Sequence, residues 1–253
     1  MFNYYSSLSS EVYDLDKHIG RSFGDVEFYT ERLAKFEGPI LEPGVGNGRI
    51  LIPLMEKGLK VDGLDISKEM LDRCRRNCIE RDLHPNLIQG NMESFALNAI
   101  YDAIIIPTGT FLLLHRRDDS LRALSNFHDH LKDGGRLFID LILQKDRTVG
   151  KTEIRTWESG EDIITLESRL TEVDEVHQYS VSHHRYEKWR KGKLIQTELE
   201  RFPLRWFGIE EFKFILESVG FSEVVLSADY QYGQYPTKTT EIITFEGIAA
   251  KKK

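Results

Sequence analysis

The sequence has only two cysteines, Cys74 and Cys78, in 253 residues. Four residues apart in a segment with helical spacing, they would share one helix face, and no second Cys/His pair has zinc-ligand spacing. Three histidines lie close together further along. His177 and His183 would stand about 20 Å apart on one strand face, and His184 would point to the opposite face. We therefore expect reduced thiols and no metal site.

Long apolar runs are also missing. The longest apolar region, residues 103–114, is interrupted by Pro107-Thr108-Gly109-Thr110 and falls short of the roughly 18 residues that a membrane-spanning helix needs. The N-terminus has no basic segment followed by an apolar one, which is the pattern of a secretory signal. We therefore expect a cytoplasmic protein that does not contact a membrane.

Positive charge is scarce, because 34 Lys and Arg face 41 Asp and Glu and give a formal net charge of -7. A net negative surface disfavours binding to a phosphate backbone, so a nucleic-acid partner is not expected. The terminal Lys251–Lys253 run is too short to change this. The length fits one large α/β domain or a domain with a substantial insertion. A monomer and a homodimer are equally compatible with the sequence.

The most informative segment is residues 40–48, Ile-Leu-Glu-Pro-Gly-Val-Gly-Asn-Gly. An apolar run ends at Glu42, glycines then alternate through Gly48, and an amphipathic segment follows at 49–57. This order predicts the strand, tight turn and helix of a nucleotide-binding α/β sheet. Glu42 would repel the pyrophosphate of a dinucleotide, and Arg49 stands where the dinucleotide fingerprint has glycine. A ligand with an ammonium group, such as S-adenosylmethionine, suits this carboxylate better.

Strands and helices alternate through the first part of the chain. The expected strands are 40–41, 60–65, 86–90, 103–106 and 136–143, and the expected helices between them are 49–57, 67–81 and 118–131. This alternation predicts a parallel sheet with right-handed crossovers. From about residue 163 to 204 the hydrophobic period becomes two, which predicts an antiparallel meander. A helix at 209–219 and strands at 221–227 and 241–249 follow.

These patterns predict an α/β fold: a Rossmann-like, mostly parallel seven-stranded sheet with helices on both faces and an antiparallel meander inserted after the fifth strand. Residues 1–35 would form an N-terminal helical lid, and residues 36–150 and 205–253 the core. The insert, residues 151–204, would lie near the carboxyl edge of the sheet, where ligands bind in such folds. We expect it to cap the substrate, with a plain structural flap as the alternative.

Over residues 36–143 the chain resembles the class I S-adenosylmethionine-dependent methyltransferases. Residues 42–48 match the glycine-rich motif, and Asp65, at the end of the second strand, matches the acidic residue that accepts both ribose hydroxyls. Asn91, in the loop beside adenine, replaces an aspartate found in many relatives, but its carbonyl oxygen can still accept from the adenine amino group. Residues 101–106 and 131–135 match the fourth strand and the turn before the fifth. The resemblance implies S-adenosylmethionine as cofactor, bound by Glu42, Gly44, Gly46, Asp65, Ile66, Asn91 and Met92.

Two further features resemble small-molecule N-methyltransferases of the antibiotic amino-sugar and glycine types. One is the strand-to-helix segment at 204–212, and the other is the combination of the insert with a lid that contains Tyr4, Tyr5 and Tyr13. This resemblance implies methyl transfer to a small-molecule acceptor, with N-methylation slightly preferred over O-methylation. The alternatives are an RNA or protein methyltransferase and a non-catalytic S-adenosylmethionine-binding protein.

The candidate general base is His115, which follows a loop that faces the methyl group in relatives and titrates in the neutral range. A histidine without a chemical role at a helix start is the alternative. Tyr5 and Tyr13 would shield the sulfonium by cation–π attraction worth about 0.5–2 kcal/mol, or else pack the terminal helix. Arg21 would pair with the methionine carboxylate, or else be solvated. Pro107, at the start of the loop, completes the predicted cofactor site.

Overall fold

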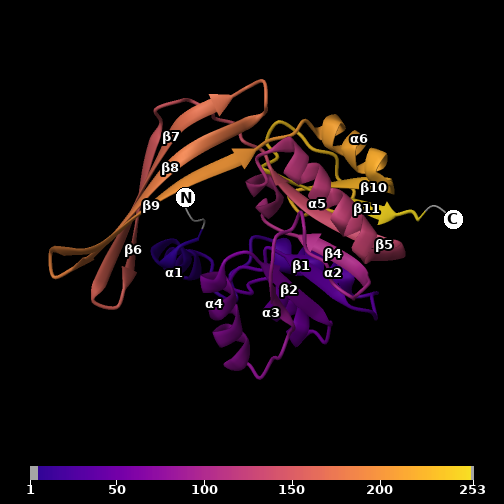
Figure 1. Ribbon diagram of the computed structural model, residues 1–253, viewed down its shortest axis with the longest axis horizontal. Coiled ribbons are helices and arrows are strands. Elements are labelled where there is room, and N and C mark those ends of the chain that lie inside the picture. The colour runs from indigo at the N-terminus through magenta and orange to yellow at the C-terminus, as the bar shows by residue number, and fades with distance from the viewer. Residues whose placement is uncertain (1–4, 252–253) are drawn as a thin grey trace.

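The computed structural model describes residues 5–251, so Tyr4 of the predicted lid lies outside the described residues. Figure 1 shows a helix-covered sheet and, beside it, a separate curved sheet. The helices are α1 Ser7–Asp16, α2 Asp25–Leu33, α3 Leu51–Glu56, α4 Lys68–Ile79, α5 Arg117–His130 and α6 Ile209–Val219, with a 3-10 turn, η1, at Thr110–Leu113. Within the described range, no helix combines the length and apolarity that crossing a lipid bilayer requires.

The larger sheet has seven strands in the order β10-β11-β5-β4-β1-β2-β3, and β11 alone runs in the opposite direction to the other six. The predicted mostly parallel seven-stranded sheet is therefore confirmed. Its strands are β1 Ile40–Pro43, β2 Val61–Asp65, β3 Leu87–Gln89, β4 Tyr101–Ile106, β5 Leu131–Ile142, β10 Phe221–Ala228 and β11 Ile242–Ala249.

Helices cover both faces of this sheet, because its central strands are apolar on both sides. In β4, Ala103 and Ile105 face a core shared with α2, α3 and α4, whereas Ile104 and Ile106 face a core shared with α5 and α6. The two cysteines lie on the buried face of α4 and are free thiols. Ser67 caps the start of α4, since its hydroxyl accepts from the Met70 amide.

The insert forms an antiparallel sheet in the order β6-β7-β8-β9, with strands β6 Thr152–Ser159, β7 Asp162–Asp174, β8 Tyr179–Arg190 and β9 Lys193–Arg205. The predicted meander began only near residue 163 and missed β6. This edge strand is mostly exposed and carries no apolar alternation from which a period could be read. The predicted turn at Asp133-Gly134-Gly135 lies within β5, where the pairing with β4 shifts register.

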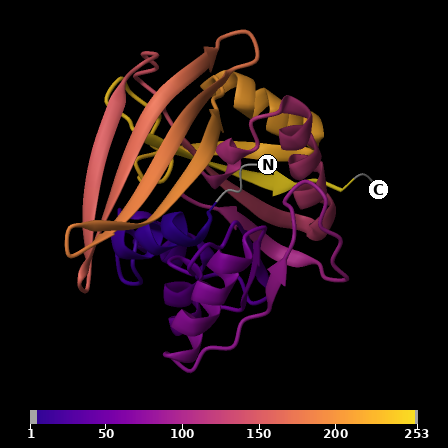
Figure 2. The same ribbon diagram turned by 60° about the vertical axis from the view of Figure 1, so that its left-hand side comes forward.

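Helix α1 lies between the insert and the core, as Figure 2 shows. Its first turn has no side-chain cap of its own. Instead, the Glu198 carboxylate on β9 accepts from the Leu8 amide at 2.7 Å, and Glu200 accepts from the Ser6 amide at 3.0 Å. Carboxylates stabilise the positive end of a helix, so β9 fixes the start of α1. That α1 acts as a lid, and the insert as a substrate cap, stays a prediction.

A buried ion pair joins the start of α2 to the glycine-rich loop. Asp25 is fully buried and Arg49 is 3% exposed, and their Oδ2 and Nη2 atoms are 2.5 Å apart. Burial opposes ionisation of the Asp25 carboxyl, but the hydrogen bonds and charge of Arg49 outweigh it, and the pKa of Asp25 is lowered. Arg49, which stands where the dinucleotide fingerprint has glycine, therefore serves as a structural cation.

We expect each of the variants Asp25→Asn and Arg49→Met to lower the free energy of unfolding by about 3–5 kcal/mol, because each leaves one buried group unpaired. The double variant should lose much less than the sum of the two, since it removes both groups. Urea denaturation measures all three. Asp72→Asn, which breaks the exposed Lys68–Asp72 pair, is the control and should cost less than about 1 kcal/mol. Fully additive losses would contradict the pairing.

Candidate active site

A cavity of about 220 Å³ lies at the carboxyl ends of β1 and β2, beside the point where the strand order reverses. Eight residues singled out from the sequence as site residues line it: Tyr13, Gly44, Gly46, Asp65, Ile66, Asn91, Met92 and His115. Tyr5, from the predicted lid, lines it too. Three predicted site residues, Arg21, Glu42 and Pro107, are not in its walls.

The glycine-rich loop requires glycine at position 44 for two reasons. Its φ angle is +76°, a left-handed conformation that side chains rarely adopt, and an added Cβ would lie 2.3 Å from Cγ2 of Thr110. The Gly44 amide donates to the carbonyl oxygen of Leu64 at 2.6 Å, which ties the loop to the end of β2. The backbone therefore comes close to the cavity without side chains in the way.

Asp65 stands at the end of β2, where its buried carboxylate accepts the amides of Gly46 and Ser67, each at 2.9 Å. Each oxygen accepts one of these bonds and keeps a second lone pair, so the group can still accept from a vicinal diol. Burial raises the pKa of the Asp65 carboxyl, and the backbone amides oppose that shift.

Glu42 lies beneath the loop and is 2% exposed. Its Oε2 atom has no hydrogen-bond partner among residues 5–251. Burial raises the pKa of this carboxyl well above its usual range, against the opposing charge of Arg49. An unused buried acceptor two residues before Gly44 fits a ligand with an ammonium group better than one with a pyrophosphate. The chain therefore has groups that fit S-adenosylmethionine, with the Gly44 backbone and Asp65 beside this acceptor.

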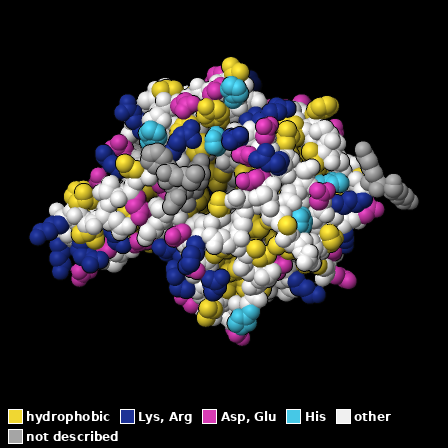
Figure 3. Space-filling view, viewed as in Figure 1, with side chains coloured by type: hydrophobic (Ala, Val, Ile, Leu, Met, Phe, Trp, Pro, Cys, Tyr) yellow, Lys and Arg dark blue, Asp and Glu magenta, His cyan; other side chains and the backbone are white. Residues whose placement is uncertain are grey.

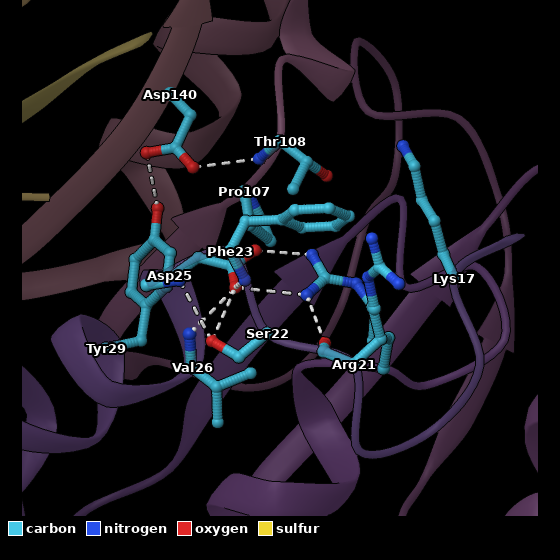
Figure 4. A network of polar contacts seen from close by, with 12 residues as sticks. Lys17, Arg21, Ser22, Phe23, Asp25, Val26, Tyr29, Pro107, Thr108 and Asp140 are labelled. Atoms are coloured by element: carbon cyan, nitrogen blue, oxygen red, sulfur yellow. Dashed lines mark hydrogen bonds and ion pairs between the residues drawn. The ribbon is translucent and has the colours of Figure 1, made fainter. Parts of the chain in front are cut away.

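Arg21 and Pro107 have other contacts. The exposed Arg21 guanidinium lies over the Phe23 ring, 5.2 Å from its centroid, and its backbone carbonyl accepts from Arg49. Pro107 is buried, and its carbonyl oxygen accepts from the Thr110 hydroxyl at 2.9 Å. Figure 4 shows the segment that carries Arg21 beside the 107–108 loop. Neither residue lines the cavity in this structure, and their binding roles stay predictions.

Figure 4 also shows a buried carboxylate that the sequence analysis missed. Asp140, on β5, is fully buried and accepts four hydrogen bonds: from the Tyr29, Tyr230 and Thr244 hydroxyls and from the Thr108 amide, at 2.7–2.9 Å. Burial raises its pKa to about 6. Thr108 has a φ angle of +52°, unusual for a β-branched residue, and the bond to Asp140 holds it there. An aspartate within the apolar 136–143 strand was the available signal.

His115 lies in the wall of the cavity and is half-buried. Burial lowers the pKa of its imidazole, and the charge of Arg201 adds to this effect. The ring is therefore neutral at pH 7 and able to accept a proton. Its edge meets the Tyr179 ring, with centroids 5.7 Å apart. A second cavity, of about 530 Å³, also has His115 in its wall.

Comparison with known proteins agrees with this geometry. Residues 40–135 match the family model described as a methyltransferase domain. The chain is 24% identical over 161 residues to the cypemycin N-terminal methyltransferase of a Streptomyces species; the match covers 62% of this chain and 65% of that relative, just under two thirds of its length. It is 27% identical over 208 residues to a glycine/sarcosine N-methyltransferase of Parasynechococcus marenigrum (strain WH8102), covering 79% of this chain and 69% of that one.

Among solved structures, the sugar N-methyltransferase KedS8 from Streptoalloteichus superposes with a TM-score of 0.76 at 21% identity, over 99% of this chain and 98% of that one. A likeness at this identity shows the fold. Together with the matching family model, the strand order and the glycine-rich loop that ends β1, it shows that the chain has the class I methyltransferase fold, with a methyltransferase domain matched over residues 40–135.

Proposed function

We propose that this enzyme methylates an amine nitrogen of a small molecule. The observation that carries the proposal is that the cofactor cavity adjoins, through His115, a second cavity of about 530 Å³. That volume is typical of small-molecule sites. The glycine/sarcosine relative and the solved structure described above are named N-methyltransferases, and the cypemycin relative is named an N-terminal methyltransferase, which supports nitrogen as the acceptor atom.

We assign the cofactor contacts to residues of the first cavity. Asp65 accepts the ribose hydroxyls, the Asn91 carbonyl oxygen accepts from the adenine amino group, and the unused Glu42 oxygen attracts the ammonium group. When bound, S-adenosylmethionine supplies a methyl group on a sulfonium, which makes that carbon electrophilic. The residues around it hold the acceptor in line with that carbon and keep water out.

The lid tyrosines and His115 complete this assignment. The Tyr5 and Tyr13 rings pack edge to face, with centroids 5.7 Å apart, over the cavity. Burial raises the pKa of Tyr13 to about 12, so its phenol stays neutral and its ring can face a cation. His115, neutral at pH 7, accepts the proton that an ammonium acceptor must lose before its lone pair can attack.

A panel of paired primary amines and alcohols of equal size tests the proposal. We expect methylated amines and no methylated alcohols, detected by mass spectrometry after incubation with S-adenosylmethionine. Methylation of the alcohols alone would contradict N-methylation. Binding of S-adenosylhomocysteine without turnover of any panel member would favour a non-catalytic binding protein. Methylation of RNA, falling steeply with salt, would favour the nucleic-acid alternative.

We expect Asp65→Ala to weaken S-adenosylhomocysteine binding about 10- to 100-fold, because a charged acceptor of two hydroxyl groups is lost. Isothermal titration calorimetry measures the affinity, and circular dichroism checks that the variant is folded. Asp62→Asn is the matched control, since Asp62 lies on the same strand but outside the cavity wall. Unchanged affinity in Asp65→Ala would contradict the assignment.

We expect His115→Gln to lower kcat about 10²- to 10⁴-fold with little change in S-adenosylhomocysteine affinity, as for loss of a general base. Because burial lowers the pKa of His115, the acid limb of kcat/KM should have its midpoint below the usual histidine range. This limb falls as the base gains a proton and should vanish in the variant. The exposed His84, changed to Gln, is the control. If His115→Gln kept the acid limb and a normal kcat, His115 would line the cavity without acting as a base.

A further inference from the structure

The second cavity has a different chemical character from the first. It lies between the start of α5, the turn that joins β7 to β8, and the end of β9. Although the protein has a net charge of -7, the wall of this cavity contains several basic side chains and only one carboxylate, that of Asp118. Its lining residues are His115, Arg116, Arg117, Asp118, Val176, His177, Gln178, Tyr179 and Arg205.

Arg205 is the informative residue in this wall, because it is 2% exposed and has no ion-pair partner among the described residues. Its Nη1 atom donates to the carbonyl oxygens of His115 and His177, both at 3.1 Å. Its Nε atom is buried without a hydrogen-bond partner among residues 5–251. Burial lowers the pKa of the guanidinium; the charge of Glu211, which forms no ion pair with it, opposes this shift, and the charge of Arg117 adds to it.

The same protein neutralises its other deeply buried arginine. Arg49 is 3% exposed and forms two hydrogen bonds with Asp25. A buried cation without such a partner is costly unless an anion reaches it. The missing carboxylate at Arg205 therefore points to a charge supplied from outside the chain.

The start of α5 adds a second source of positive potential at this cavity. Its N-cap residue, Arg116, makes no capping bond, and the first amides of a 14-residue helix carry the positive end of its dipole. Figure 3 shows Lys, Arg and His side chains gathered on this face, with acidic side chains between them.

Nearby carboxylates outside the cavity wall already have partners. Asp119 pairs with Arg116 and Arg122, and Asp174 accepts from His177 at 2.8 Å. Glu211 accepts from the Gln178 side chain and from the Gly208 amide, each at 3.0 Å. These pairings leave Arg117 and Arg205 as cations without an ion pair among the described residues.

We propose that the cavity at Arg205 is an oxyanion subsite that binds a phosphate or carboxylate group of the methyl acceptor. The inference rests on the proposed function, because His115 belongs to the walls of both cavities. An acceptor that places its anionic group against Arg205 and the α5 N-terminus brings its amine to the cofactor side of His115. The enzyme then selects small amines that carry an oxyanion.

The binding step is tested by calorimetric titration of inorganic phosphate, pyrophosphate and acetate into the full chain saturated with S-adenosylhomocysteine. We expect at least one of these anions to bind, and binding to weaken as salt is added. Arg205→Gln should weaken it about tenfold or more, and the exposed Arg117→Ser about two- to fivefold. Arg122→Ser, on the same helix but outside the cavity, is the control and should bind as the parent does.

Arg205 also bonds the His177 carbonyl in the turn between β7 and β8, so its loss can disturb that turn. The Arg117→Ser variant tests the subsite without this change. Absence of binding for all three anions, or equal binding by the parent and both cavity variants, would overturn the subsite. Tighter binding of phosphate than acetate identifies a phosphorylated acceptor, and the reverse a carboxylated one.

A second arm separates this inference from the proposed function. Amines bearing a phosphate, a carboxylate or no anionic group are compared as acceptors, and Arg117→Ser should lower kcat/KM only for the anionic ones. Anion binding without methylation of any amine would contradict the proposed function but support the oxyanion subsite. Methylation of neutral amines alone, with no anion bound, would contradict the oxyanion subsite but support the proposed function.

Discussion

The arrangement of this fold depends on one topological constraint, the reversal of strand order between β1 and β4. Strands β2 and β3 are added on one side of β1, and β4 and β5 on the other, so the loops that leave β1 and β4 move apart. The cavity forms in the gap between them, lined by Gly44 after β1 and by Thr110 after β4. The loops after β2 and β3 supply Asp65 and Asn91 to the same opening. A cofactor placed there touches four segments that are remote in sequence.

Much of this could be predicted from local patterns. The helix over residues 209–219, ended by Gly220, has the predicted bounds, because both its apolar face and its end are local signals. Gly44 and Gly46 of the glycine-rich loop and Asp65 at the end of β2 also line the cavity, whereas Glu42 does not. Asp140 escaped prediction because its partners Tyr29 and Tyr230 lie 111 and 90 residues away. Arg21 was expected on its chemistry alone, and no sequence pattern predicted its packing over Phe23.

The two buried arginines show how the fold handles charge. Arg49 has an internal counterion and serves as a structural link between α2 and the glycine-rich loop. Arg205 donates hydrogen bonds to the backbone carbonyls of His115 and His177. These bonds fix the positions of the two residues but do not neutralise the charge of the guanidinium. Equal burial therefore has different consequences. A paired cation stabilises the fold, whereas an unpaired one raises the electrostatic potential of the cavity that it faces.

Helix α1 is attached on both sides, through Glu198 and Glu200 to the insert and through Asp14 to the core, where the Asn47 amide donates to it at 2.8 Å. Tyr5, just before this helix, and Tyr13, within it, line the cavity beside Asp65. The shape of this cavity therefore depends on Glu198 and Glu200, two residues of the insert that do not line it.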